Sequence, residues 1–333
     1  MDDRVRRAKI GAVKLLDLLL ASDPAVPEIA SMAAWWERHQ AVVAGGGAAI
    51  DQAILGGFAA DRAGYAFASG YQAALRRLEP ALPTARLASL CVTERGGGHP
   101  RAIESELTPI PSGPGEGEAY LLRGSKRWAT ISDVAGVLLV AARLGPPDDR
   151  GRPRIRLARV NTNLPGVTIT PMPEAPFTPE ILHGELRFDD VRVEAAALLP
   201  GDGYERYIKP FRTIEDLHVH GALLGYLLGE ARRGAFPRAL VERLAALLIT
   251  LRALAAGDPS DAGVHVAVAG ALHTGAQLVT DLEAAWAPTA SPSYARWQRD
   301  RPLLSFAEST RRKRLERAWS RLAEGSEASP GES

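Results

Sequence analysis

The hydrophobic pattern of the sequence changes twice, and these changes limit the folds that the chain can adopt. Between residues 87 and 203, short apolar runs alternate with Pro and Gly, which is typical of short strands joined by turns. Before and after this stretch, apolar residues recur at helical spacing. This order predicts an α+β multidomain protein in which a β domain lies between two helical domains in the sequence.

The pattern predicts four segments. An N-terminal helical domain covers residues 1–86, with helices from 35 to 43 and from 48 to 77 separated by a glycine loop at Gly45 to Gly47. A middle domain covers residues 87–203, and its strands favour a small antiparallel barrel or sandwich. These strands are predicted at 119–122, 136–142, 155–160, 167–170 and 185–188.

The third segment, residues 204–322, is predicted to form a four-helix bundle. Its helices include 262–286 and 303–322, and a leucine-rich stripe from Leu240 to Leu251 is expected to be buried. Residues 323–333 are small and polar, which predicts a disordered tail.

Composition excludes several classes of protein. Forty basic and 39 acidic residues give a formal net charge of +1, so nothing favours binding to nucleic acid or to an anionic membrane. No apolar run appears long enough to span a membrane. The single cysteine, Cys91, excludes an internal disulfide and fits a reducing compartment. We therefore expect a cytoplasmic protein.

The stretch from Leu87 to Ile131 carries the strongest candidate site. It begins as a strand that runs into three glycines, and a turn is predicted at Gly124 before a second, short strand. Alternation along that strand places Trp128 and Thr130 on one face. A flat ring, a hydroxyl and bare glycine backbone suit a flat ligand that forms hydrogen bonds.

These residues resemble the acyl-CoA dehydrogenase family. That family has a strand C-V-T-E-P-G-x-G-S and, further on, G-x-K-x-W-I-T-N. Here Cys91 to His99 reads C-V-T-E-R-G-G-G-H, and Gly124 to Ile131 reads G-S-K-R-W-A-T-I. Two later segments, 164–169 and 186–193, are similar to the family's P-G-V-T-I and F-x-D-V-R-V.

The resemblance implies an FAD-dependent enzyme in which the flavin lies between the β domain and the C-terminal bundle. It assigns the flavin ring contacts to Thr93, Trp128 and Thr130, with Cys91 and Val92 on the same strand. The glycine turn would approach the pyrophosphate through Gly98, and His99 stands where the family has Ser. The alternative is that Thr93 and Trp128 belong to an ordinary strand and its core and bind no ligand.

The resemblance also implies a catalytic base. In many family members R-D is followed, after seven residues, by E-G-T, whose Glu removes the α-proton of an acyl thioester while the β-hydride leaves for flavin N5. The same spacing from Arg299-Asp300 leads to Glu308-Ser309-Thr310, so Glu308 is the candidate base. An apolar site around Glu308 is expected, because desolvation would make the carboxylate a stronger base. The alternative is a solvated glutamate in a charged helix.

One segment departs from the family pattern, and another keeps it. The family's Q-x-x-G-G, which meets the FAD of a neighbouring subunit, is replaced by D-L-E-A-A at 281–285. Acidic side chains and methyl groups there oppose a pyrophosphate. Arg233 to Phe236 matches the family's R-x-x-F, so Arg233 is a candidate contact for the adenine half of FAD.

We therefore expect an FAD-dependent dehydrogenase of acyl-CoA or acyl-carrier-protein thioesters, forming a homodimer or homotetramer. An electron-transfer flavoprotein is a candidate electron acceptor. Two alternatives remain: a scaffold without redox activity that serves as a binding or partner subunit, and a flavin monooxygenase of the same fold. No metal is expected, since His218 and His220 are two apart on a helix and point to different sides.

Overall fold

The computed structural model describes residues 11–111 and 117–327, which form two compact units. Unit 1 comprises Met1–Arg77, Pro176–Glu180 and Thr213–Ser333, and unit 2 comprises Leu78–Ala175 and Ile181–Arg212. The helices that begin and end the chain therefore belong to one unit, although the sequence suggested two separate helical domains. The predicted boundaries at 86, 203 and 322 stay predictions.

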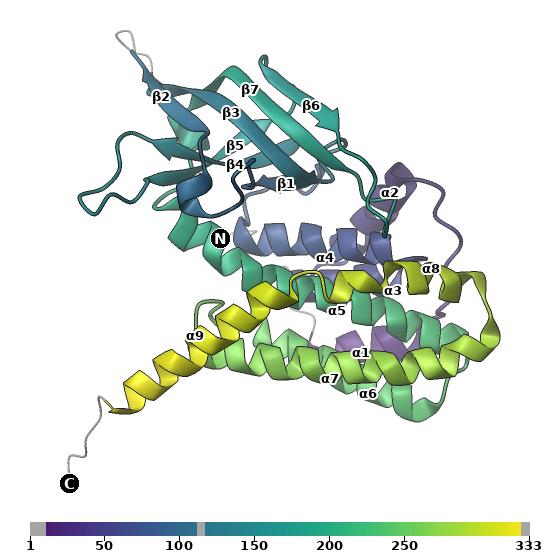
Figure 1. Ribbon diagram of the computed structural model, residues 1–333. Coiled ribbons are helices and arrows are strands. Elements are labelled where there is room, and N and C mark those ends of the chain that lie inside the picture. The colour runs from purple at the N-terminus through teal and green to yellow at the C-terminus, as the bar shows by residue number, and fades with distance from the viewer. Residues whose placement is uncertain (1–10, 112–116, 328–333) are drawn as a thin grey trace, which may run out of the picture. The chain divides into compact units, whose positions relative to one another are not determined.

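Unit 1 is helical, and its helices follow the predicted pattern (Figure 1). They are α1 (Ala12–Ala21), α2 (Met32–Ala44), α3 (Ala49–Phe58), α4 (Ala63–Leu78), α5 (Lys209–Arg233), α6 (Arg238–Leu254), α7 (Ala262–Trp286), α8 (Pro292–Asp300) and α9 (Glu308–Glu327). The first residues of α5 and the last residue of α4 fall in unit 2. Helix α6 buries Leu240, Leu244, Leu247, Leu248 and Leu251, which confirms the predicted stripe.

Glycine lets α3 and α5 touch backbone to backbone. A Cβ on Gly57 would lie 1.8 Å from the Ala222 carbonyl oxygen, and one on Gly225 would lie 2.4 Å from that of Ile54. Neither position can accept a larger residue without moving a helix. The two helices are therefore fixed at close range, and α5 lies in the core of unit 1, where nearly all of its residues are buried.

The C-terminal helices differ from expectation at two points. Residues Arg301–Leu304 form a 3₁₀ turn, and α9 begins only at Glu308 rather than at 303. Pro302 explains the difference, because its fixed φ and missing N–H suit a short turn better than a helix interior. Helix α9 then continues to Glu327, so the first residues of the predicted disordered tail are helical, and 328–333 lie outside the described residues.

Helix α7 is the longest apolar helix. Ala262–Thr289 is the one segment of the described chain that is long and apolar enough to cross a membrane, judged by length and composition alone. The sequence predicts no apolar run of membrane-spanning length and predicts a helix of the bundle at 262–286. This helix packs against α6 and α9, and 28% of its apolar window is buried inside the described structure.

Unit 2 contains a seven-stranded sheet, and its order is β1-β4-β2-β3-β7-β6 with β5 also paired to β4 (Figure 1). The strands are β1 (Ala88–Cys91), β2 (Glu106–Ile110), β3 (Ala119–Thr130), β4 (Val137–Leu144), β5 (Ile155–Asn161), β6 (Val167–Pro171) and β7 (His183–Glu194). Most pairs are antiparallel, as predicted, but β4 lies parallel to both β1 and β2. The α+β class is confirmed.

Strand β3 runs unbroken through the position where a turn was predicted. Gly124 is not a turn but part of an irregularity in the pairing with β7, and a second irregularity follows between Lys126 and Ala129. Gly124 has φ +134°, and a Cβ there would lie 2.4 Å from the Ser105 Oγ. The glycine is needed for a bulge that keeps the strand in the sheet, so the prediction of a turn was wrong.

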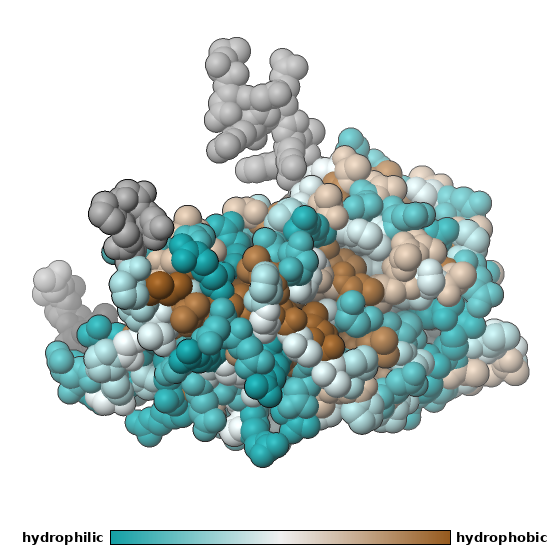
Figure 2. Space-filling view, turned by 90° about the horizontal axis from the view of Figure 1, so that it is seen from above, coloured by the Kyte–Doolittle hydropathy of each residue, from teal (hydrophilic) through white to brown (hydrophobic). Residues whose placement is uncertain are grey.

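The surface mixes polar and apolar residues. On the face shown in Figure 2, hydrophobic residues gather near the centre and hydrophilic residues surround them.

Replacement of Gly124 by Ala should destabilise unit 2 by at least about 2 kcal/mol, because the new methyl group meets Ser105 and the backbone conformation is strained. Gly145 offers a matched control. It also has positive φ, +72°, but open space around it, so Gly145→Ala should cost only about 1 kcal/mol. Urea unfolding of both variants measures the difference, and equal losses would contradict the role assigned to Ser105.

Stability of unit 1 should fall as the pH drops below 6.5. Burial lowers the pKa of His39 to about 3 and that of His218 to about 4. The unfolded chain therefore binds more protons in this range, at about 1.4 kcal/mol per pH unit for each histidine. In His39→Gln the slope of stability against pH between 6.5 and 5 should drop by one such contribution, which urea unfolding at several pH values measures, and an unchanged slope would contradict the lowered pKa of His39.

Candidate functional site

The triple glycine closes a tight turn at the end of β1. Glu94 and Gly97 exchange two backbone hydrogen bonds, Glu94 N to Gly97 O at 3.1 Å and Gly97 N to Glu94 O at 2.9 Å. Gly97 has φ +106°, a conformation that favours glycine. A Cβ on Gly98 would lie 3.3 Å from the Thr93 Oγ1, so the bare backbone of Gly98 lies beside that hydroxyl.

His99 follows the turn and begins the 3₁₀ helix Pro100–Ala102. Its Nδ1 accepts a hydrogen bond from the Arg101 N–H at 3.3 Å, and its side chain is exposed. This contact leaves Nε2 as the ring atom that can donate to an external group. The predicted phosphate contact at His99 is compatible with this arrangement and stays a prediction.

Trp128 lies in the second bulge of β3. Its backbone is left-handed, with φ +59°, and its N–H donates to the Met172 Sδ at 3.4 Å. The indole is 54% exposed, whereas Ala129 is buried, so Trp128 and Thr130 share the outer face. The bulge explains why Lys126, two residues earlier, points into the core instead.

A backbone hydrogen bond joins the two motifs. The Arg127 N–H donates to the Thr93 carbonyl oxygen at 2.8 Å, which fixes the end of β1 beside the bulge of β3. The structure therefore places Thr93 and Gly98 beside the bulge that contains Trp128, and the assignment of these residues to a flavin stays a prediction. The Cys91 side chain is 1% exposed, and burial raises the pKa of its thiol to about 12, so the predicted contact of Cys91 with the cofactor cannot be made by its thiol.

Sequence reasoning missed three neighbours of these residues. His183 pairs with Thr130 across the sheet, and its ring packs edge-on to Trp128 with centroids 6.2 Å apart. Glu94 and Lys126 form a buried ion pair at 2.5 Å beneath the turn. The pairing of β3 with β7 and the core position of Lys126 are tertiary features, and the sequence carried no local signal for either.

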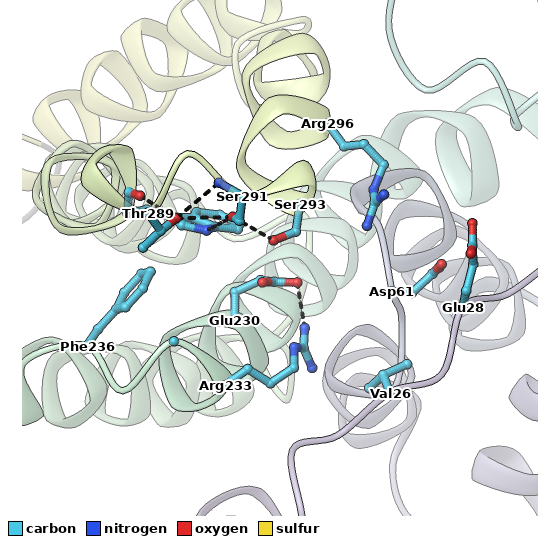
Figure 3. A pocket seen from close by; sticks show the side chains of 12 residues that line it. Val26, Glu28, Asp61, Glu230, Arg233, Phe236, Thr289, Ser291, Ser293 and Arg296 are labelled. Carbon is cyan, nitrogen blue, oxygen red and sulfur yellow. Dashed lines mark hydrogen bonds and ion pairs between the residues drawn. The ribbon is translucent and has the colours of Figure 1, made fainter.

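A pocket of about 390 Å³ in unit 1 contains the other predicted cofactor contact (Figure 3). Arg233 lines it together with Phe236, and Trp286, which directly follows the 281–285 segment, completes an aromatic wall with Phe236 at 6.0 Å. Arg296 of α8 points into the same pocket in Figure 3. Arg233, the candidate adenine contact, thus lies in one pocket with Trp286, the residue that follows the 281–285 segment.

The charges of this pocket are largely balanced within unit 1. The Arg233 guanidinium donates to Glu230 and to the Pro24 carbonyl oxygen, each at 2.7 Å. Glu28 and Asp61 add two more carboxylates to the lining. Arg233 is therefore already engaged, and a pyrophosphate would meet carboxylates as well as guanidinium groups.

The 281–285 segment is also engaged internally. Asp281 pairs with Arg243 at 2.7 Å, and Glu283 accepts from the Trp297 Nε1 at 2.8 Å and pairs with Arg301 at 2.9 Å. These contacts hold α7 against α6 and α8. The acidic residues that replace the family's Q-x-x-G-G thus have a structural role in this chain.

Glu308 is the first residue of α9 and is exposed. It lies at the rim of a largely apolar groove between α7 and α9, whose lining includes Ala269, Leu315 and Trp319. The apolar enclosure that was expected for a catalytic base is therefore only partial in the described chain. Glu308 and Arg233 line different pockets of unit 1.

The segment before Glu308 is anchored by Asp300. This carboxylate is fully buried, receives the Thr178 N–H at 2.8 Å and forms two hydrogen bonds with Arg299, at 2.7 and 2.8 Å. Phe177 packs edge-on against Phe306, with ring centroids 6.0 Å apart. The R-D pair thus fixes the chain eight residues before the candidate base.

Two surfaces can be tested against FAD. In unit 2 the exposed indole of Trp128, the hydroxyl groups of Thr93 and Thr130 and the bare backbone of Gly98 fit a flat ring that bears hydrogen-bond acceptors. In unit 1 the carboxylates around Arg233 fit a pyrophosphate less well. Among the described residues, no three His, Cys, Asp or Glu side chains gather as a metal site.

Comparison with known proteins agrees with the sequence motifs. Residues 89–191 match the family model of the acyl-CoA dehydrogenase middle domain. The probable acyl-CoA dehydrogenase FadE10 of Mycobacterium tuberculosis is 31% identical over 129 residues, which cover 38% of this chain and 19% of that protein. YngJ of Bacillus subtilis, also a probable acyl-CoA dehydrogenase, is 34% identical over 98 residues, 28% of this chain and 24% of its own length. The matches thus span about a quarter of these relatives or less.

Solved structures share the fold across most of the chain. Butyryl-CoA dehydrogenase from Megasphaera elsdenii has a TM-score of 0.66 at 17% identity, covering 89% of this chain and 91% of that one. The prolyl acyl carrier protein oxidase AnaB has a TM-score of 0.60 at 17% identity, covering 92% and 97%. Residues 89–191 thus match the middle domain of the acyl-CoA dehydrogenase family, and the chain shares its fold with solved acyl-CoA dehydrogenases.

Proposed function

We propose that the protein is an FAD-dependent dehydrogenase of acyl thioesters. The observation that carries the proposal is the grouping of Thr93, Gly98, Trp128 and Thr130 in unit 2, within the residues that match the middle-domain model. Thr93 and Thr130 would donate hydrogen bonds to the edge of the flavin ring. Trp128 would cover its face, and Gly98 would let the chain approach the pyrophosphate. FAD, when bound, supplies a two-electron acceptor for the hydride that leaves the substrate Cβ.

Glu308 would take the proton from the substrate Cα, so that the loss of proton and hydride leaves a Cα=Cβ double bond. An exposed carboxylate is a weak base for a carbon acid, because water solvates the charge. The apolar groove beside Glu308 supports the proposal, since an acyl substrate there would displace water from the carboxylate. The proposal requires Glu308 and the flavin contacts to face the same substrate.

Both thioester carriers remain candidates for the substrate. The fold neighbours butyryl-CoA dehydrogenase and the prolyl acyl carrier protein oxidase AnaB are named for one carrier each, CoA and acyl carrier protein. We further propose that an electron-transfer flavoprotein accepts the electrons and that the protein acts in the cytoplasm as a homodimer or homotetramer. Analytical ultracentrifugation of the full chain tests the oligomeric state.

A second candidate function is a binding subunit of the same fold without redox activity. It is favoured by the carboxylates around Arg233, by the engagement of Glu283 in unit 1 and by Ser309, which adds a side chain after the candidate base where the family has Gly. The first experiment below separates the two functions.

The purified protein, supplied with FAD and freed of excess, should show a flavin absorbance spectrum. Trp128→Ala should raise the dissociation constant of FAD about tenfold, equivalent to about 1.4 kcal/mol, because the ring loses its stacking partner. Trp319→Ala is the matched control, since that indole is similarly exposed, 57%, but lies on α9. A protein that retains no FAD would exclude the dehydrogenase and leave the binding subunit.

Acyl thioesters should bleach the flavin absorbance of the loaded protein, and Glu308→Gln should slow the bleaching by at least about a hundredfold, the usual size of a general-base contribution. Glu316→Gln, also an exposed position of α9, is the control and should leave the rate unchanged. Stopped-flow absorbance with short and long acyl-CoA and with acyl carrier protein measures the rates. Unchanged bleaching in Glu308→Gln would assign the base to another residue.

A further inference from the structure

A fully buried lysine lies beneath the candidate flavin face. Lys126 is 0% exposed, and its Nζ donates to the Glu94 Oε1 at 2.5 Å and to the Val92 carbonyl oxygen at 3.4 Å. Glu94 is itself buried, and its two carboxylate oxygens accept the backbone N–H groups of Ser105 at 3.1 Å and Glu104 at 2.7 Å. The ion pair is thus satisfied from three separate segments of unit 2.

Stability alone does not account for such a pair. Removing two charges from water costs several kcal/mol per ion, and well-packed apolar residues of similar volume often stabilise a fold equally well or better. What the pair adds is a fixed geometry, because charged hydrogen bonds are short and directional. The positions that it fixes therefore indicate its role.

Those positions flank the residues assigned to the flavin. Val92 and Glu94 enclose Thr93 in the sequence, and Lys126 precedes Trp128 by two residues, at the start of the bulge. The Arg127 N–H, between Lys126 and Trp128, donates to the Thr93 carbonyl oxygen at 2.8 Å. The side-chain pair and this backbone bond join the same two segments from the core side.

We infer that Glu94 and Lys126 are positioning residues that hold Thr93 and the left-handed backbone of Trp128 in the geometry that receives the flavin ring. The inference rests on the proposed function for the identity of the ligand, but its geometric part concerns unit 2 alone. Without the pair, β1 and the bulge of β3 would stay in the sheet but would be free to shift relative to each other.

The test uses a neutral replacement of the whole pair in the full-length protein. Glu94→Gln with Lys126→Met keeps the volumes nearly unchanged and leaves no unpaired buried charge. We expect the double variant to fold, amide hydrogen exchange in residues 92–98 and 126–130 to accelerate at least about tenfold, and the dissociation constant of FAD to rise about tenfold.

The matched control is Asp51→Asn with Arg252→Met. This pair joins a fully buried carboxylate to a guanidinium at 2.5 Å in unit 1. Its removal should leave FAD affinity and exchange in 92–98 and 126–130 unchanged, because the pair lies in unit 1. A loss of FAD affinity in this control as large as in the Glu94/Lys126 variant would assign the effect to general stability and overturn the inference.

A second variant, Glu94→Asp, retains both charges but shortens one side chain, and it should show the same two effects at smaller size. If amide exchange and FAD affinity in both variants equal those of the wild type, the positioning role is overturned. If both variants unfold, the pair is a requirement of the fold, and the positioning role is overturned as well. Faster exchange in a protein whose wild type retains no FAD would refute the proposed function while supporting the positioning role.

Discussion

The hydrogen bond from the Arg127 N–H to the Thr93 carbonyl oxygen is the contact on which the candidate site depends. It joins segments that lie 34 residues apart in the chain and so determines whether the glycine turn and the exposed indole can serve one ligand. β1 pairs with β4 and β3 pairs with β2 and β7, so no ladder bond of the sheet connects the two motifs directly. The bulge in β3 turns the Arg127 amide toward Thr93 and supplies the missing connection.

Much of the architecture could be predicted from the sequence, because helices and strands follow from the spacing of apolar residues that are close together in the chain. The leucine stripe of α6 and the alternation in the strands are properties of neighbouring residues, and both agree with the structure. The residues assigned to the flavin were chosen through motifs whose order along the chain resembles that of the family, and this assignment stays a prediction. The predicted turn failed at Gly124 because a glycine in a bulge and a glycine in a turn carry the same sequence signal.

The remaining features depend on contacts between distant residues. Nothing near Lys126 in the sequence shows that its side chain faces the core, since strict alternation would place it with Trp128. The carboxylates around Arg233 come from helices and loops that the sequence could not bring together. The exposure of Glu308 likewise follows from its place as the first residue of α9. Pro302, in the 3₁₀ turn Arg301–Leu304, determines where that helix begins.

The single thiol has a consequence for how this protein behaves in oxidising or alkylating solution. Cys91 is the last residue of β1 and is 1% exposed, and burial raises the pKa of its thiol, so the folded chain offers no reactive thiolate at its surface. Chemical modification of Cys91 requires β1 to detach from the sheet. The rate of that modification therefore measures how often β1, the strand that leads into Thr93 and the glycine turn, opens.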